Sequence, residues 1–240
     1  MRNIYVPASG LDAWQARLAD PEVHWKRGRS AFELAVSWEL ATRSEGGLPP
    51  QVSEVLDCHP QLQKASVLFA LPEHQVRLDG KGKASQTDLW ALLRNEQGLI
   101  SLAVEGKAGE PFDKTVEAWL GESENRRVRL AGLCQILELP QDRITKLRYQ
   151  LLHRAASAVL EARRCGAANA VLLIQSFGQG GTGYSDFQDF CSAMDVVDQR
   201  GRIVSVPQFA STSLWLGWMD CPCATDDDIV KAAMRPSERP

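Results

Sequence analysis

The segment Asp88-Leu-Trp-Ala-Leu-Leu-Arg-Asn-Glu-Gln-Gly-Leu-Ile-Ser-Leu-Ala-Val-Glu-Gly-Lys107 contains two apolar runs separated by a polar turn at residues 95–98. The first run begins with Asp88, and the second ends in Glu105-Gly-Lys107. Side chains alternate between the two faces of a strand, so Glu105 and Lys107 point the same way. If the two runs pair as a hairpin, Asp88 can lie near Glu105. Two carboxylates and one ammonium would then meet at one end of a small sheet.

Such a cluster is suited to hold Mg²⁺ and to generate a nucleophilic water. Hard Mg²⁺ takes oxygen ligands, here from Asp88, Glu105 and the carbonyl of Gly106, and keeps waters in its other positions. The metal lowers the pKa of a bound water, and Lys107 can orient that water or stabilise charge on a phosphate oxygen. The alternative is an ordinary cross-strand charge pair, worth a few tenths of a kcal/mol to about 1 kcal/mol.

The composition is that of a folded globular protein without disulfide staples. The chain has 240 residues, of which 44% are hydrophobic and 24% charged, enough for one sizeable core. A net charge of −3 gives no global basic excess, so any contact with nucleic acid needs a local patch. Six scattered cysteines indicate reduced thiols. With no signal peptide and no apolar run long enough for a membrane span, we expect a cytoplasmic protein with no membrane partner.

The order of helical and extended segments predicts one α/β domain with a mixed sheet. We expect residues 1–28 to form an N-terminal extension packed on the body, residues 29–223 to form the domain, and residues 224–240 to form a polar, frayed tail. Periodicity and capping signals predict helices at 30–43, 51–57, 115–120, 128–139, 144–164 and 186–193, and strands at 64–71, 75–78, 88–94, 99–106, 170–177, 203–209 and 214–218.

Two glutamates of the first predicted helix are candidates to support the site. Ser30 at the N-cap with Glu33 three residues later fits a capping box, so Glu33 has either that structural role or a functional one. Glu39 shares the apolar face of the helix with Phe32 and Val36. A carboxylate on a buried face is costly without a partner, which favours a functional role for Glu39.

The long helix predicted over residues 144–164 carries a polar stripe beside its apolar one. Gln150 and His153 belong to that stripe. His153 is either a supporting residue of the site or a satisfied, partly buried histidine. Arg148 and Arg154 either bind phosphate or are simply solvated.

The pattern of Asp88 followed by Glu105-x-Lys107 at the end of an apolar strand resembles the PD-(D/E)XK nuclease superfamily. That superfamily contains restriction endonucleases, Holliday-junction resolvases and recombination exonucleases. Its shared core is a helix, an antiparallel three-stranded meander that bears the motif, a second helix and a further strand. The order of elements over residues 29–177 is similar to that core. The chain departs from the pattern at Thr87, which precedes Asp88 where the superfamily often has proline.

Three further segments together resemble an uncharacterised bacterial family usually placed in the same superfamily. They are residues 104–112, the run from Arg148 to Arg154, and the late Leu-Gly-Trp strand. This second resemblance supports the fold more than any activity.

The resemblance implies a restriction-endonuclease-like α/β core with a mixed central sheet flanked by helices. It implies a Mg²⁺-dependent phosphodiesterase, with Mn²⁺ as the other candidate metal, that hydrolyses nucleic acid, DNA in the first place. In that scheme Asp88, Glu105 and Gly106 hold the metal and Lys107 assists the attacking water. Gln150 resembles a glutamine that lines the active cleft of recombination exonucleases. A homodimer is a further expectation.

Two other functions stay open at this stage. The chain could be a catalytically silent module of nuclease fold that binds nucleic acid or a protein partner. It could also be a structural protein in which residues 88, 105 and 107 are ordinary surface charges. Other enzyme classes are not favoured, because the glycines at 178–183 lack the Lys-Ser/Thr of a P-loop and no Gly-x-Ser-x-Gly is present.

Overall fold

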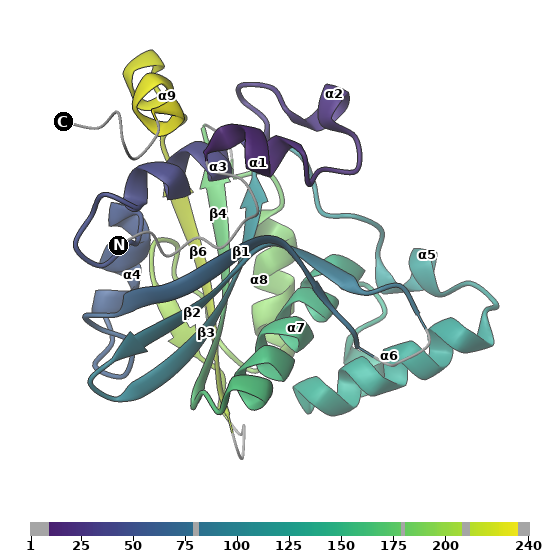
Figure 1. The fold of residues 1–240 in the computed structure, drawn as a ribbon. Coiled ribbons are helices and arrows are strands. Elements are labelled where there is room, and N and C mark those ends of the chain that lie inside the picture. The colour runs from purple at the N-terminus through teal and green to yellow at the C-terminus, as the bar shows by residue number, and fades with distance from the viewer. Residues whose placement is uncertain (1–9, 79–81, 179–180, 208–211, 235–240) are drawn as a thin grey trace.

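A computed structural model describes residues 10–78, 82–178, 181–207 and 212–234, and shows a mixed six-stranded sheet with helices on both faces (Figure 1). The strands are β1 (Ser66–Val76), β2 (Ser85–Asn95), β3 (Gly98–Lys107), β4 (Asn169–Phe177), β5 (Ile203–Ser205) and β6 (Ser213–Cys221), in the spatial order β1-β2-β3-β4-β6-β5. The first three form an antiparallel meander, β4 runs parallel to β3 and β6 parallel to β4, and β5 is antiparallel to β6. The expected α/β class with a mixed, helix-flanked sheet is confirmed.

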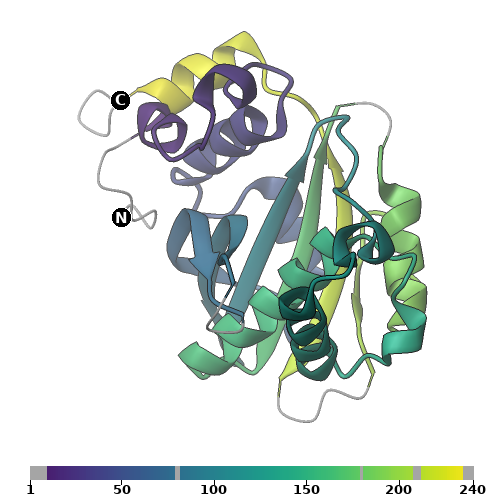
Figure 2. The ribbon, with the colours of Figure 1, turned by 90° about the vertical axis from the view of Figure 1, so that its right-hand side faces the viewer.

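Helices cover the sheet in two layers, one on each face (Figures 1 and 2). One layer contains α1 (Leu11–Gln15), α3 (Ser30–Ala41) and α4 (Pro50–Asp57), and the other contains α6 (Glu124–Leu137), α7 (Tyr149–Cys165) and α8 (Tyr184–Ala193). The shorter helical pieces are α2 (Pro21–His24), α5 (Val116–Leu120) and the 3₁₀ turn η1 (Gln141–Arg143). No helix within the described ranges is long and apolar enough to cross a membrane.

The β2–β3 hairpin predicted from the sequence is present, and its turn is built as the sequence suggests. Asn95 pairs with Gly98 at the end of the ladder. The Asn95 side-chain oxygen accepts hydrogen bonds from the backbone N–H groups of Gln97 at 2.9 Å and Gly98 at 3.1 Å. Gly98 has a φ of 131°, a conformation that favours glycine. These contacts set the register of the hairpin.

Two apolar cores lie on opposite faces of the sheet, and the side chains of the hairpin alternate between them. Odd-numbered residues 89–93 of β2 lie in the core beneath α3, whereas Trp90 and Leu92 lie in the core beneath α7. In β3 the faces are exchanged, so the even-numbered residues 100–104 face α3. Because the period is two, Asp88, Glu105 and Lys107 all fall on the α7 side of the sheet.

Several element boundaries differ from the sequence predictions. Two strands are expected at residues 64–71 and 75–78, but Ser66–Val76 forms the single strand β1, whose position at the edge of the sheet can accommodate Pro72. The long helix begins at Tyr149 and not at residue 144, and Arg148 before it forms an isolated bridge with Thr115. The strand expected over 203–209 is observed only for Ile203–Ser205; residues 208 and 209 lie outside the described ranges.

The expectation of a frayed tail after residue 223 is wrong for α9 (Asp226–Ala233). Thr225 and Asp228 form a capping box that starts this helix. Ala232 is buried, and the Arg43 side chain of the α3–α4 loop donates to the carbonyl of Lys231. The helix packs against α3. The last residues, 235–240, lie outside the described part.

Candidate functional site

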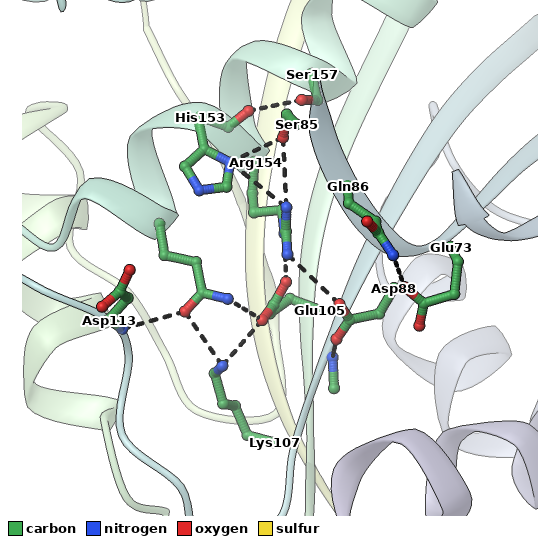
Figure 3. Close-up of polar contacts among 12 residues, drawn as sticks. Glu73, Ser85, Gln86, Asp88, Glu105, Lys107, Asp113, His153, Arg154 and Ser157 are labelled. Carbon is green, nitrogen blue, oxygen red and sulfur yellow. Dashed lines mark hydrogen bonds and ion pairs between the residues drawn. The ribbon is translucent and has the colours of Figure 1, made fainter. Parts of the chain in front are cut away.

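Asp88 and Glu105 stand opposite each other at the end of the β2–β3 hairpin. The register pairs Leu89 with Val104, and its continuation by one residue sets Asp88 against Glu105. Directly opposed residues project to the same face, so both carboxylates face α7 (Figure 3). The Glu105 side chain is 2% exposed and that of Asp88 is 24% exposed. The pair is therefore mostly enclosed and is not an ordinary pair of surface charges.

The guanidinium of Arg154 contacts both of these carboxylates. Its Nε donates to Glu105 Oε2, and its Nη2 lies 3.5 Å from Asp88 Oδ1 (Figure 3). A guanidinium has donors spread over a rigid fork, so one arginine can serve two acids at once. Arg154 was a candidate for binding phosphate, and in the structure it neutralises the acid pair.

Lys107 and Gln150 complete the surroundings of Glu105. Lys107 Nζ lies 2.9 Å from Glu105 Oε1, and the Gln150 amide donates to the same oxygen at 2.5 Å. Gln150 Oε1 in turn accepts from Lys107 Nζ and from the backbone N–H of Asp113, each at 3.3 Å. Both carboxylate oxygens of Glu105 thus accept hydrogen bonds from protein donors. The structure brings together Asp88, Glu105, Lys107 and Gln150, as the sequence predicted for the centre of the site.

Burial and charge pairing move the pKa values of the two acids in opposite directions. Burial alone would raise the pKa of Glu105, but the positive charges of Arg154 and Lys107 outweigh it and lower the pKa to about 2. Burial, followed by the neighbouring charge of Glu105, raises the pKa of Asp88 to about 8 in spite of Arg154. At neutral pH Glu105 is therefore the ionised member of the pair, and Asp88 is the member that takes up a proton more readily.

A second series of hydrogen bonds leads from Arg154 to His153. Arg154 Nη1 lies 3.3 Å from Ser85 Oγ, and Ser85 Oγ lies 2.8 Å from His153 Nδ1 (Figure 3). Burial, with the charge of Arg154, holds the pKa of His153 well below its usual range, so its ring is neutral. Sequence reasoning named His153 but missed Ser85, because an isolated serine before a strand carries no signal.

An open cavity of about 670 Å³ adjoins this cluster, at the first turns of α7. The basic residues in its lining are Lys83, Arg126, Arg129 and Arg154. Trp119 and Tyr149 also line it, and their rings stack with centroids 3.7 Å apart and planes 9° apart. Asp113 is the single acidic residue in the described lining. The cavity therefore combines positive charge with flat aromatic surface.

The Glu33 carboxylate accepts hydrogen bonds from backbone groups. The donors are the N–H groups of Gly28 at 2.7 Å and Ala224 at 2.6 Å. The predicted capping box is wrong, because Arg29, not Ser30, is the N-cap of α3 and no side chain caps the helix. Glu33 ties the chain before α3 to the segment that precedes α9.

Glu39 is fully buried and serves the packing of the N-terminal segment. It accepts a hydrogen bond of 3.0 Å from the indole Nε1 of Trp14, which is itself buried. This contact holds α1 on α3. No contact links Glu33 or Glu39 to the acid pair among the described hydrogen bonds and ion pairs.

Arg148 and Gly106 have contacts that differ from those expected. Arg148 pairs with Asp186 at 2.8 Å and is absent from the described lining of the cavity. The N–H of Gly106 donates to Asp88 Oδ2 at 2.9 Å. A Cβ atom on Gly106 would lie 3.4 Å from Ser30 Cβ, which is an ordinary van der Waals contact.

Glu73 is an acid of this region that sequence reasoning missed. The β1–β2 register pairs residues 72 with 89 and 74 with 87, so Glu73 stands opposite Asp88. Its carboxylate accepts from Gln86 at 2.6 Å, and burial raises its pKa. Residue 73 fell between two predicted strands, and so no face could be assigned to it.

The donors, as arranged, do not fit a divalent metal ion. Mg²⁺ needs oxygen lone pairs that converge on it. Both oxygens of Glu105 accept from neighbouring side chains, and Asp88 Oδ2 accepts from Gly106. An incoming cation would also meet the positive charges of Arg154 and Lys107. Across the described ranges, no group of three or more His, Cys, Asp or Glu side chains could hold a metal ion.

Comparison with known proteins gives a family but no described relative. No curated protein and no solved structure gives a significant match to the chain. One family model matches residues 7–223, a range that contains the whole sheet and every residue of the cluster around Arg154. The chain therefore belongs to the family described as Domain of unknown function (DUF6946).

Proposed function

We propose that this protein is a nucleic-acid-binding module with a nuclease-like core, in which Arg154 takes the place of a metal ion. The observation that carries the proposal is the cavity beside the acid cluster, with four basic residues in its lining. Phosphate groups of nucleic acid are bound mainly by such clustered positive charge. The negative charge of the whole chain is compatible with this function, because the basic residues gather locally.

The aromatic wall of the cavity favours nucleic acid over a simple anion. Trp119 and Tyr149 line the cavity with their rings stacked on each other, and the guanidinium of Arg126 lies 5.6 Å from the Trp119 ring centroid. Aromatic side chains beside basic ones are typical of single-strand binding, in which bases stack without regard to sequence. Single-stranded DNA is the partner we favour.

A Mg²⁺-dependent phosphodiesterase is the second candidate. It is favoured by the placement of Asp88 opposite Glu105 with Lys107 on the same face. The order α3, β1–β3, α7, β4 also agrees with the core of the PD-(D/E)XK superfamily. In this case Asp88 and Glu105 would hold Mg²⁺ or Mn²⁺, which supplies an activated water. Arg154 would first have to leave the acids.

Binding and cleavage assays separate the two candidates. Fluorescence anisotropy with labelled single-stranded DNA, duplex DNA and RNA is measured in EDTA, Mg²⁺ and Mn²⁺, and products are examined on denaturing gels. We expect binding that does not require a divalent metal ion, is weaker in Arg126→Ala, and is unaccompanied by cleavage. Arg163→Ala is the matched control, since Arg163 is an exposed arginine of α7 outside the described lining of the cavity.

The remaining outcomes are equally informative. Metal-dependent cleavage that disappears in Lys107→Ala would establish the second candidate. Absence of binding to all three nucleic acids would reject the proposed function.

A cytoplasmic location belongs to the same proposal and is supported by the cysteines, all six of which are free. Dimer formation is a separate part of it, tested by light scattering of the purified chain.

A further inference from the structure

Two hydrogen bonds meet at the Ser85 hydroxyl. A guanidinium can only donate, so Arg154 Nη1, at 3.3 Å, donates to Ser85 Oγ. The Ser85 hydroxyl has one hydrogen and two lone pairs, and its other close partner is His153 Nδ1 at 2.8 Å. The hydroxyl can therefore donate to Nδ1 or accept from it, and donation makes Nδ1 the acceptor.

The position of Arg154 supports the same assignment. Its Nη1 lies 3.5 Å from His153 Nδ1, so a hydrogen on Nδ1 would face the guanidinium. The ring is neutral at ordinary pH, because burial and the charge of Arg154 lower the pKa of His153. A neutral imidazole carries one hydrogen, and with Nδ1 accepting, that hydrogen is on Nε2.

The Nε2 atom of His153 has no hydrogen-bond partner among the described residues. In Figure 3 it lies on the side of the ring away from Ser85 and Arg154. His153 lines the cavity together with Lys83 and Arg129. An N–H donor at the wall of a basic cavity is matched by an anionic oxygen that comes from outside the chain.

We infer that His153 Nε2–H is a binding group for a non-bridging phosphate oxygen of the strand in the cavity, and that Ser85 is the residue that orients it. This inference rests on the proposed function and names the contact by which the cavity recognises the backbone. A neutral donor differs from the surrounding lysine and arginines, because its hydrogen bond depends on direction more than on salt.

The tautomer is tested first, without any ligand. Nitrogen-15 NMR of histidine-labelled wild-type protein at neutral pH should show His153 with an unprotonated Nδ1 and a protonated Nε2. In Ser85→Ala the resonances should shift toward a mixture of tautomers. A protonated Nδ1 in the wild type would overturn the inference, whatever the protein binds.

The binding contact is tested with a labelled single-stranded oligonucleotide. Hydrogen bonds to charged groups contribute about 1.5–3 kcal/mol, so His153→Ala should weaken binding about tenfold or more. His153→Gln keeps an N–H donor and should recover part of the loss. His24→Ala, at an exposed histidine of α2, is the control and should bind like the wild type.

The outcomes distinguish this inference from the proposed function. Equal affinity of His153→Ala and wild type would overturn the inference and leave nucleic-acid binding intact. No binding by the wild type would reject the proposed function and the phosphate contact together. Addition of oligonucleotide should also move the Nε2 resonance of the wild type, which requires no variant to fold; an unmoved resonance in a saturated complex counts against the contact.

Discussion

Arg154 and Glu105 form an ion pair inside the protein, with side chains 9% and 2% exposed, respectively. They are 49 residues apart in sequence and come together because α7 packs on β3. Removing one partner of a buried ion pair leaves an uncompensated charge in a poorly solvated place. The pair therefore holds the site together only as long as both members are present.

The Arg154→Met variant should be less stable than the wild type by about 3–5 kcal/mol, because Glu105 then loses its main partner. The free energy of unfolding is measured by urea titration at neutral pH, followed by circular dichroism. Arg163→Ala removes an exposed arginine from the same helix and should stay within about 0.5 kcal/mol of the wild type. An equally small change in the free energy of unfolding of Arg154→Met would contradict the claim that Arg154 and Glu105 form a buried ion pair.

The double variant Glu105→Gln/Arg154→Met should recover part of the stability that each single change removes. With both charges gone, neither is left unpaired, although Lys107 still lacks its partner. Contacting residues show interaction energies of about 0.5–3 kcal/mol, and we expect a value toward the upper end. Four urea curves complete the cycle, and strictly additive losses would show that the two side chains do not interact.

The pH dependence of stability should show opposite contributions from Asp88 and Glu105. Folding raises the pKa of Asp88 from 3.8 to about 8, so its contribution is full below about pH 4 and is lost as the pH rises toward 8. Folding lowers the pKa of Glu105 from 4.5 to about 2, so its contribution is full above about pH 4.5 and is lost as the pH falls toward 2.

The Asp88→Asn variant isolates the contribution of Asp88 to the pH dependence of stability. Relative to the wild type, this variant should gain stability as the pH rises from about 4 to about 8, because asparagine has no proton to release. Urea unfolding at a series of pH values measures the difference. Asp189→Asn, at an exposed position of α8, is the control and should give a difference that varies little with pH. A flat profile for Asp88→Asn would mean that Asp88 is ionised throughout.

Divalent metal ions should leave the thermal midpoint of the wild type unchanged. A ligand at one hundred times its dissociation constant stabilises a protein by about 2.7 kcal/mol, which a thermal melt detects easily. Melts in EDTA, Mg²⁺ and Mn²⁺ should therefore overlap, since Arg154 and Lys107 already neutralise the acids. A saturable rise of the thermal midpoint with Mn²⁺ that is lost in Glu105→Gln would show that a metal ion displaces Arg154 from the acids.

Binding of single-stranded DNA should weaken steeply with salt. Each phosphate neutralised on a single strand contributes about −0.7 to the slope of log K against log salt. Arg154 is paired with the acids, so if the other three basic residues of the cavity take part, the slope is about −2. Arg126→Ala should make it shallower by about 0.7, and Arg163→Ala should leave it unchanged. Anisotropy titrations over a series of KCl concentrations provide the measurement.

The strand pattern of Asp88–Lys107 was sufficient to predict the hairpin and the common face of its three charged residues. The reason is that alternation has a period of two and depends only on neighbouring residues. Residue 73 shows where this local reasoning stops. Residue 73 lies between the two strands predicted at 64–71 and 75–78, and only the pairing of β1 with β2 shows that one strand runs through it.

Sequence reasoning also assigned Gln150 to the site, because Gln150 and His153 share a polar stripe on α7. The sequence of this helix could not show whether Arg154 contacts a phosphate or a carboxylate, since a guanidinium pairs with either anion. That choice depends on how far α7 lies from β3 and on its rotation about its own axis. Both are set by the packing of the apolar core beneath the helix.

Sequence alone therefore determines the α/β class, the hairpin and the grouping of Asp88, Glu105 and Lys107, because these follow from short-range periodicity. Tertiary structure decides that Arg154 lies where a metal ion would be expected, and that Ser85 orients His153 from 68 residues away. Such contacts join side chains whose distance is fixed by the packing of separate elements. No local pattern of residues encodes that distance, and so the chemistry of the site becomes visible only in the folded chain.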